Sequence, residues 1–203
     1  MTKTIVTISR EYGSGGREVG KKLAEALGVP FYDNELITIA AQKSGFSEGL
    51  FEGADQKPTG SLLYSLSMYG AGVAAFDLPL SDKVFLIQSD IIKEVASKSG
   101  CVIVGRCADY VLREFPNTVN AFLHAELNDR VGWAIRENDV PVEKAKEAVL
   151  KIDKRRAAYY SYYTSQKWGR AENYDLSIDS SALGVDGTVE ILKRFVELAD
   201  AKR

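Results

Sequence analysis

Histidine and cysteine are nearly absent from this chain. Its 203 residues include one histidine, His124, and two cysteines, Cys101 and Cys107. Two cysteines are too few for a disulfide framework, and their spacing matches no metal-ligand pattern, so reduced thiols are expected. The single histidine nearly excludes histidine-based catalytic triads and histidine-rich metal sites. Whatever chemistry the protein performs therefore rests on other side chains.

Long apolar runs and an excess of one charge are lacking too. Lys3 is followed by only a five-residue apolar strand, which is too short for a signal peptide, and no run approaches the length of a membrane span. The chain has 26 basic and 28 acidic residues. This balance argues against general binding to nucleic acid or membrane surfaces. We expect a cytoplasmic protein without nucleic-acid or membrane partners, of a length that fits one domain.

Short apolar segments alternate with amphipathic ones along the chain. Strands are predicted over residues 4–8, 30–32, 101–104, 119–123 and 176–178. Helices are predicted over residues 18–27, 35–43, 82–98, 129–138, 142–163 and 189–198. Strands separated by helices indicate an α/β fold, with a parallel sheet covered on both faces.

The most informative segment runs from Thr4 to Gly20, with the sequence TIVTISREYGSGGREVG. A β-prone run leads into a glycine-rich turn, and an amphipathic helix follows at once. Glycines let backbone amides approach an anion, and the helix N-terminus favours negative charge. The segment therefore predicts a nucleotide-phosphate site, although an ordinary glycine-rich turn is the alternative.

This loop departs from the usual phosphate-loop pattern, G-x-x-x-x-G-K-[ST]. With Gly15 as the second glycine of the pattern, the first glycine is replaced by Arg10. The lysine is replaced by Gly16 and the hydroxyl residue by Arg17.

Several segments, in their order along the chain, resemble the nucleoside monophosphate kinases, and specifically cytidylate kinase and the cytidylate kinase-like proteins. They are the glycine-rich loop, Phe31-Tyr-Asp33, Cys101-Val-Ile-Val-Gly-Arg106, a basic helix, and the segment from Tyr174 to Leu192. The resemblance implies a P-loop fold with a five-stranded parallel sheet, helices on both faces, an insert for the nucleoside monophosphate (NMP) and a helical lid. It implies one domain, with the core at 1–33, 99–135 and 171–203, the insert at 34–98 and the lid at 136–170. The implied cofactors are ATP and Mg²⁺.

The resemblance assigns the donor phosphates to the loop. The implied binding residues are Arg10, Gly13, Ser14, Gly15, Gly16 and Arg17. Since the family's lysine falls at Gly16, we expect Arg17, or failing that Arg10, to supply the missing charge. Glu18 occupies the position of the family's Mg²⁺-coordinating hydroxyl. It is either a Mg²⁺ ligand or a first-turn acid favoured by the helix dipole.

Two residues, Asp33 and Arg106, are assigned to the acceptor by the same resemblance. A third, Gln88, is assigned from its place on the inward-facing or cleft side of its helix. Asp33 is expected to hold ribose hydroxyls or a base amino group, or else to cap the following helix. Gln88 is expected to read a base edge. Arg106, at the carboxyl end of a buried strand, is expected to hold the acceptor phosphate, or else to pair with a nearby acid.

The basic helices match the family's lid. Its candidate residues are Arg130, Arg136, Arg155 and Arg156, of which the last two are counted, with Arg17 and Arg106, as catalytic. The alternative is a solvated charged face. The following aromatic segment, which includes Tyr159, Tyr160, Tyr162, Tyr163 and Trp168, is expected to stack a ring, to pack in the core, or to form a homodimer contact.

The favoured function is therefore ATP-dependent phosphoryl transfer to a nucleoside monophosphate, with CMP or dCMP as the acceptor. Two alternatives stay open: a kinase of another small metabolite, and a non-catalytic nucleotide-binding regulatory protein. The replaced lysine is the main argument for the second alternative.

Overall fold

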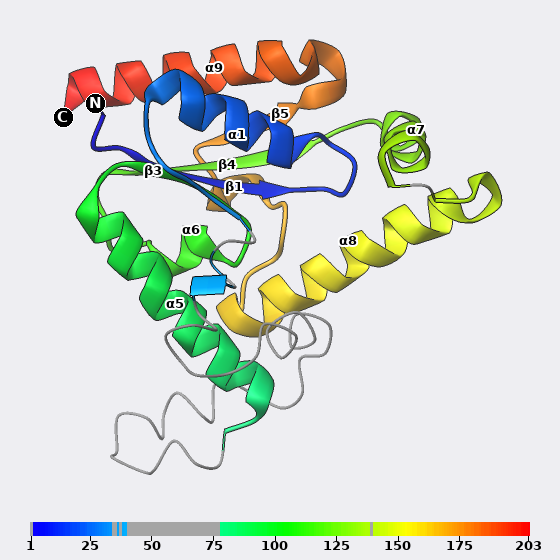
Figure 1. The fold of residues 1–203 in the computed structure, drawn as a ribbon, viewed down its shortest axis with the longest axis horizontal. Helices are drawn as coiled ribbons and strands as arrows, with labels where there is room; N and C mark the ends of the chain where they lie inside the picture. The colour runs from blue at the N-terminus through cyan, green and yellow to red at the C-terminus, as the bar shows by residue number, and fades with distance from the viewer. Residues whose placement is uncertain (1, 34–35, 37, 40–77, 139) are drawn as a thin grey trace.

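The protein folds around a five-stranded, all-parallel sheet with the strand order β2-β3-β1-β4-β5. The computed structural model describes residues 2–33, 36, 38–39, 78–138 and 140–203. Helices cover both faces of the sheet, as Figure 1 shows. The α/β fold with a five-stranded parallel sheet is thus confirmed.

The strands are short and mostly buried. Their bounds are β1 Ile5–Arg10, β2 Phe31–Tyr32, β3 Cys101–Val104, β4 Thr118–His124 and β5 Leu176–Asp179. Central β1 pairs with β3 only as far as Ile8, but with β4 as far as Arg10. The end of β1 therefore extends beyond β3, and this end lies at the carboxyl edge where ligands bind to open parallel sheets.

The helices of the described chain divide into three groups. Their bounds are α1 Gly16–Leu27, α5 Leu80–Lys98, α6 Ala108–Val111, α7 Leu127–Asn138, α8 Val142–Thr164 and α9 Ser180–Lys202, with a 3₁₀ turn, η2, at Ala171–Asn173. Helices α1 and α9 lie together over one face of the sheet, and α5 and α6 over the other (Figure 1). Helix α7 and the first part of α8 pack on each other and project away from the sheet (Figure 1), whereas the end of α8 joins the core beside α5. None of these described helices is long and apolar enough to cross a membrane.

Two apolar clusters hold the layers together. Alternate residues of β1 and β3 face opposite sides: Ile5 and Ile103 join the cluster with α5 and α6, whereas Val6 and Val102 join the one with α1 and α9. The buried side chains of α1, among them Leu23, repeat at helical spacing and pack on the second cluster. Burying both sheet faces in this way fixes the register of each strand.

Two details of the sequence prediction are wrong, and a third falls outside the described residues. Arg10, predicted to lie in the loop, is the last residue of β1, because pairing with Leu123 of β4 continues the strand. Helix α9 begins at Ser180 rather than at residue 189, with the Asp179 side chain accepting a hydrogen bond from the Ser181 amide. The helix predicted over 35–43 falls largely outside the described residues, as does most of the predicted insert.

Candidate phosphate-binding site

The glycine-rich loop between β1 and α1 presents unpaired backbone amides. Gly13 and Gly15 adopt left-handed conformations with φ of 82° and 72°, which favour glycine. Among the described residues, no hydrogen bond uses the amide of Gly13, Gly15, Gly16 or Arg17. Amides left unpaired at a turn and a helix N-terminus form a natural anion site.

The loop is held in this shape from behind. The Ser14 hydroxyl donates to the Glu11 carbonyl at 2.9 Å. The carbonyl of Ser14 accepts a 2.8 Å hydrogen bond from Ser180, the first residue of α9, whose hydroxyl also lies 3.0 Å from the carbonyl of His124. The protein's own contacts with β4 and α9 therefore hold the loop in this shape.

Arginine side chains gather beside the loop. The partly buried Arg10 interacts electrostatically with Arg106, Arg156 and the buried Asp33. Burial is the main cause that lowers the pKa of Arg10 to about 9, and the positive charge of Arg156 lowers it further. The Arg156 Nη1 donates to the Arg10 carbonyl at 3.0 Å, and its guanidinium lies 5.6 Å from the centre of the Tyr12 ring. Three cations facing one carboxylate leave a net positive site suited to a polyanion.

Arg106 lies where β3 gives way to α6. Gly105, Arg106 and Cys107 form a run of three left-handed residues, with φ of 78°, 59° and 53°. Two of these three are not glycine, and such a conformation is unfavourable for residues with a β-carbon. The chain thus maintains a strained turn that puts Arg106 at the carboxyl edge, as the sequence predicted for an acceptor-phosphate residue.

Arg17 points outward and towards Asp33. Its Nε lies 2.9 Å from the Asp33 Oδ2, and its side chain is 70% exposed, against 8% for Asp33. The structure therefore brings Arg17 beside the predicted acceptor aspartate. Arg17 is largely exposed there, whereas the partly buried Arg10 side chain lies against Gly16.

We expect the Arg17→Ala variant to change ATP affinity by no more than about fivefold. The Arg17 side chain is 70% exposed, and an ionic contact made by a solvent-exposed charge contributes about 1 kcal/mol or less. Isothermal titration of wild type and variant with ATP measures this directly. The matched variant is Asp33→Asn, which removes the buried partner. A loss of ATP binding by Arg17→Ala as large as that caused by removing Arg10 would show that Arg17 is the main cation of the loop.

Arg130, a predicted lid residue, belongs to a buried ion network at the base of α7 and α8. Its guanidinium pairs with Asp153 of α8 and, at 3.3 Å, with Glu11 of the loop. Asp153 also accepts a 2.7 Å hydrogen bond from the Tyr12 amide. The backbone of Arg130 packs directly on Gly13, where an added β-carbon would lie 2.7 Å from the Arg130 carbonyl oxygen. Arg130 therefore positions the loop against the projecting helices.

Glu11 and Asp153 are site-supporting residues that the sequence interpretation did not assign. The only signal was one acid within the basic run from Lys151 to Arg156. Nothing in the sequence pairs that acid with Arg130, because the two residues come together only when α7 packs on α8.

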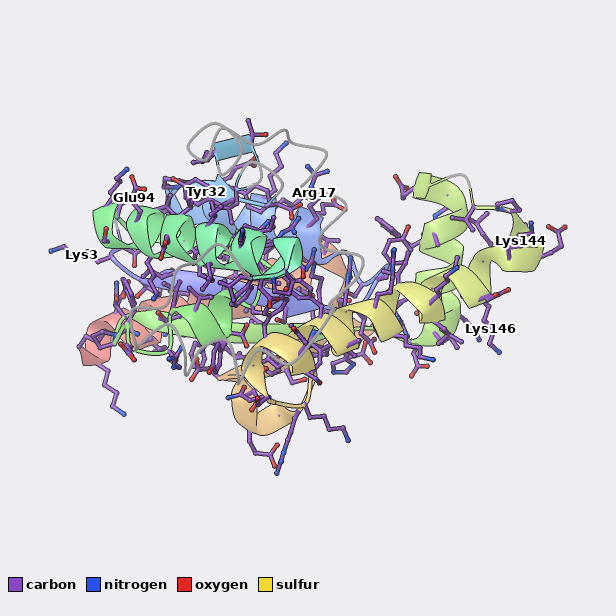
Figure 2. All side chains as sticks on the ribbon, turned by 90° about the horizontal axis from the view of Figure 1, so that it is seen from below. Lys3, Arg17, Tyr32, Glu94, Lys144 and Lys146 are labelled. Carbon is purple, nitrogen blue, oxygen red and sulfur yellow. The ribbon has the colours of Figure 1, made fainter. Side chains whose placement is uncertain are left out.

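The remaining lid candidates lie away from the cluster. Arg155 is exposed and weakly affects Arg156. Arg136 is exposed and lies along its own helix, with its Nη1 near Gly132. Figure 2 shows Lys144 and Lys146 still farther out on the projecting pair, far from Arg17. Phosphate contacts by Arg136 and Arg155 stay predictions.

Glu18, the predicted Mg²⁺ ligand, lies exposed to solvent in the first turn of α1. Its side chain is 55% exposed in the first turn of α1, and a carboxylate oxygen lies 3.4 Å from the Lys22 Nζ. In the described part of the chain there is no cluster of three or more residues able to hold a metal ion. Glu18 alone could contribute one carboxylate to a Mg²⁺ ion that keeps its other ligands as waters and phosphates. Its role as a Mg²⁺ ligand stays a prediction.

The predicted base-reading residue Gln88 is deeply buried on α5. Its side chain is in the core, and neither its Nε2 nor its Oε1 has a hydrogen-bond partner within the described chain. Unpaired buried amide atoms are rare in folded proteins, so they mark Gln88 as a candidate for ligand contact.

The tyrosine-rich end of α8 packs mainly inward. Tyr160 and Tyr163 are buried, and their hydroxyls donate to Asp109 at 2.7 Å and to Asp82 at 3.2 Å. Burial raises the pKa of both carboxyl groups, an effect that these hydrogen bonds oppose. Core packing thus accounts for these two rings, and a homodimer contact through this segment stays a prediction.

Comparison with known proteins places these features in a family. The model of the cytidylate kinase-like family matches residues 5–182, so the chain belongs to that family. A cytidylate kinase from Ignicoccus hospitalis is 24% identical over 195 residues, which cover 95% of this chain and 99% of the relative.

Solved structures agree on the fold. An uncharacterized protein from Eubacterium ventriosum superposes with a TM-score of 0.73 at 26% identity, covering 96% of this chain and 98% of the other. A shikimate kinase from Bacteroides thetaiotaomicron gives a TM-score of 0.55 at 13% identity, with the same coverage. At that identity the second match shows the fold alone. Family membership and the relative named cytidylate kinase relate the chain to kinases of nucleotides.

Proposed function

We propose that the protein transfers a phosphoryl group from ATP to a nucleoside monophosphate, with CMP or dCMP as the preferred acceptor. The observation that carries the proposal is the loop of unpaired amides beside the guanidinium groups of Arg10, Arg106 and Arg156. Family membership and the relative named cytidylate kinase support the choice of acceptor.

In this scheme the donor phosphates lie over Gly13–Arg17, and the acceptor phosphate is held by Arg106. Asp33 and Gln88 hold the acceptor's sugar and base, and Arg156 stabilises the charge on the migrating group. Phosphoryl transfer of this kind depends on positioning and electrostatics and needs little covalent chemistry from the protein. A Mg²⁺ ion near Glu18 would neutralise part of the phosphate charge when bound.

A kinase of another small metabolite is the second candidate. It is favoured by the fold shared with a shikimate kinase. A non-catalytic sensor is less well supported, because a binding module has little need for arginines on both the donor and the acceptor side.

A screen for ADP release with purified protein, ATP and Mg²⁺ tests the proposal. We expect CMP and dCMP to give the highest turnover among the common nucleoside monophosphates. Shikimate and gluconate serve as metabolite acceptors, and the Arg106→Ala variant, purified identically, reports any contaminating kinase.

Three outcomes are distinct. Turnover with CMP above all other acceptors supports the proposal. Turnover with shikimate or gluconate alone selects the metabolite kinase. Tight ATP binding without turnover on any acceptor selects the regulatory protein.

A further inference from the structure

The side chain of Arg10 takes an unusual course through the site. A β-carbon added at Gly16 would lie 2.7 Å from both the Cβ and the Cγ of Arg10. A β-carbon added at Gly105 would lie 2.2 Å from the Arg10 Nη1. The side chain therefore passes directly against the first residue of α1 and ends beside the first residue after β3. Both contacts are possible only because positions 16 and 105 carry no side chain.

Arg10 and Gly16 have exchanged the residue types that a phosphate loop normally carries. In the G-x-x-x-x-G-K-[ST] pattern the first position is glycine and the seventh is lysine, whose ammonium group reaches the β- and γ-phosphates. Here the first position is Arg10 and the seventh is Gly16. The cation is thus retained, but it enters from the end of β1 instead of from the first turn of the helix.

We propose that Arg10 is the cation that binds the donor's terminal phosphates, and that Gly16 is required because Arg10 fills the space of a side chain at that position. The proposal rests on the proposed function for the identity of the donor, but not for the identity of the acceptor. It explains how a phosphate loop without its lysine keeps a positive side chain.

The surroundings of Arg10 fit this role. Its backbone is held by pairing with Leu123 of β4, and its carbonyl accepts a hydrogen bond from Arg156. Its guanidinium lies between the end of the loop and the turn that carries Arg106, with Asp33 as the nearby carboxylate. Burial and the neighbouring charge of Arg156 both lower the pKa of Arg10. A polyanion placed there would relieve the repulsion among the three arginines.

Restoring glycine at position 10 and lysine at position 16 tests the proposal. Pyrophosphate and ADP are titrated calorimetrically into wild type and the variants Arg10→Gly, Gly16→Lys, Arg10→Gly/Gly16→Lys and Arg10→Ala/Gly16→Lys. The Arg194→Ala variant, which removes an exposed arginine on α9, is the control. Circular dichroism establishes that each variant is folded.

We expect Arg10→Gly to weaken pyrophosphate binding about 10- to 100-fold, the range for one charge-assisted hydrogen-bonding group. The double variant Arg10→Gly/Gly16→Lys restores the usual glycine–lysine order and should regain at least about tenfold of that loss. The Arg10→Ala/Gly16→Lys variant should not, because alanine keeps the β-carbon that lies 2.7 Å from a β-carbon at position 16.

Pyrophosphate binding by Arg10→Gly equal to wild type would overturn the proposal. So would equal binding by the two folded double variants. If Gly16→Lys alone fails to fold while Arg10→Gly/Gly16→Lys folds and binds, the steric part of the proposal is supported. A wild-type protein that phosphorylates no nucleoside monophosphate, yet shows the predicted pyrophosphate pattern, removes the proposed function and leaves this inference standing.

Discussion

Replacing Arg106 with alanine is expected to lower kcat/KM for phosphoryl transfer by about a hundredfold or more. Arg106 follows β3 at the carboxyl edge, in a strained left-handed conformation, and interacts with Arg10 at the centre of the site. Loss of a charge-assisted contact in such a site removes about 3 kcal/mol of transition-state stabilisation. In the proposed scheme the donor phosphates lie over the loop, so ATP affinity should change little. Steady-state kinetics and calorimetric titration with ATP measure the two quantities separately.

Two further variants separate the charge of Arg106 from its backbone strain, and a third serves as the control. Arg106→Asn suits the left-handed conformation and should be as inactive as alanine. Arg106→Lys keeps the charge without the planar fork and should retain part of the activity. Arg113→Ala, which removes an exposed arginine just beyond α6, should behave as wild type. Wild-type turnover in Arg106→Ala would remove this residue from the mechanism.

Replacing Arg130 with alanine is expected to lower the free energy of unfolding by about 3–5 kcal/mol. The variant leaves Glu11 and Asp153 without the cation that lies between them, in a region where the Arg130 side chain is only 7% exposed. It also removes the hydrogen bond from the Arg130 Nε to the Ala125 carbonyl, at 3.1 Å. Urea unfolding followed by circular dichroism measures the change.

A double-variant cycle identifies the cause of that loss. Arg130→Ala/Asp153→Asn removes one of the two unpaired charges and should be more stable than Arg130→Ala alone, because the two residues are coupled. Arg194→Ala, which breaks an exposed pair with Glu197, should cost less than about 1 kcal/mol. An Arg130→Ala variant as stable as Arg194→Ala would contradict the role of the buried network.

The bounds of a strand or helix were predictable wherever the spacing of apolar residues alone determines them. Strand β3 was predicted at its observed bounds, Cys101–Val104, because a continuous apolar run is typical of a strand buried on both faces. The end of β1 was missed because Ser9 and Arg10 are polar, and only their pairing with β4 makes them strand. The start of α9 was missed because the helix kinks at Gly184, which interrupts the apolar spacing.

The candidate site likewise has residues that local sequence predicts and residues that only the fold brings together. The loop glycines and Arg106 were predicted from local sequence, and the structure brings them to one edge of the sheet, while their phosphate contacts stay predictions. The network of Arg130 was not identifiable, because its partners Glu11 and Asp153 come from distant segments. The sequence also did not decide whether Arg17 or Arg10 supplies the missing positive charge of the loop. The side on which each arginine leaves the chain depends on where β1 ends and α1 begins.

The contact between Arg10 and Gly16 has an evolutionary consequence. A lysine arising first at position 16 meets the Cβ and Cγ of Arg10, whereas a glycine arising first at position 10 meets no obstacle but removes the cation. A lineage passing from this loop to the common one would therefore have to change position 10 first and survive a weakly binding ancestor. In the reverse direction, glycine must appear at position 16 before arginine appears at position 10. Both directions of change therefore pass through the same intermediate, a loop with glycine at positions 10 and 16 and with neither cation.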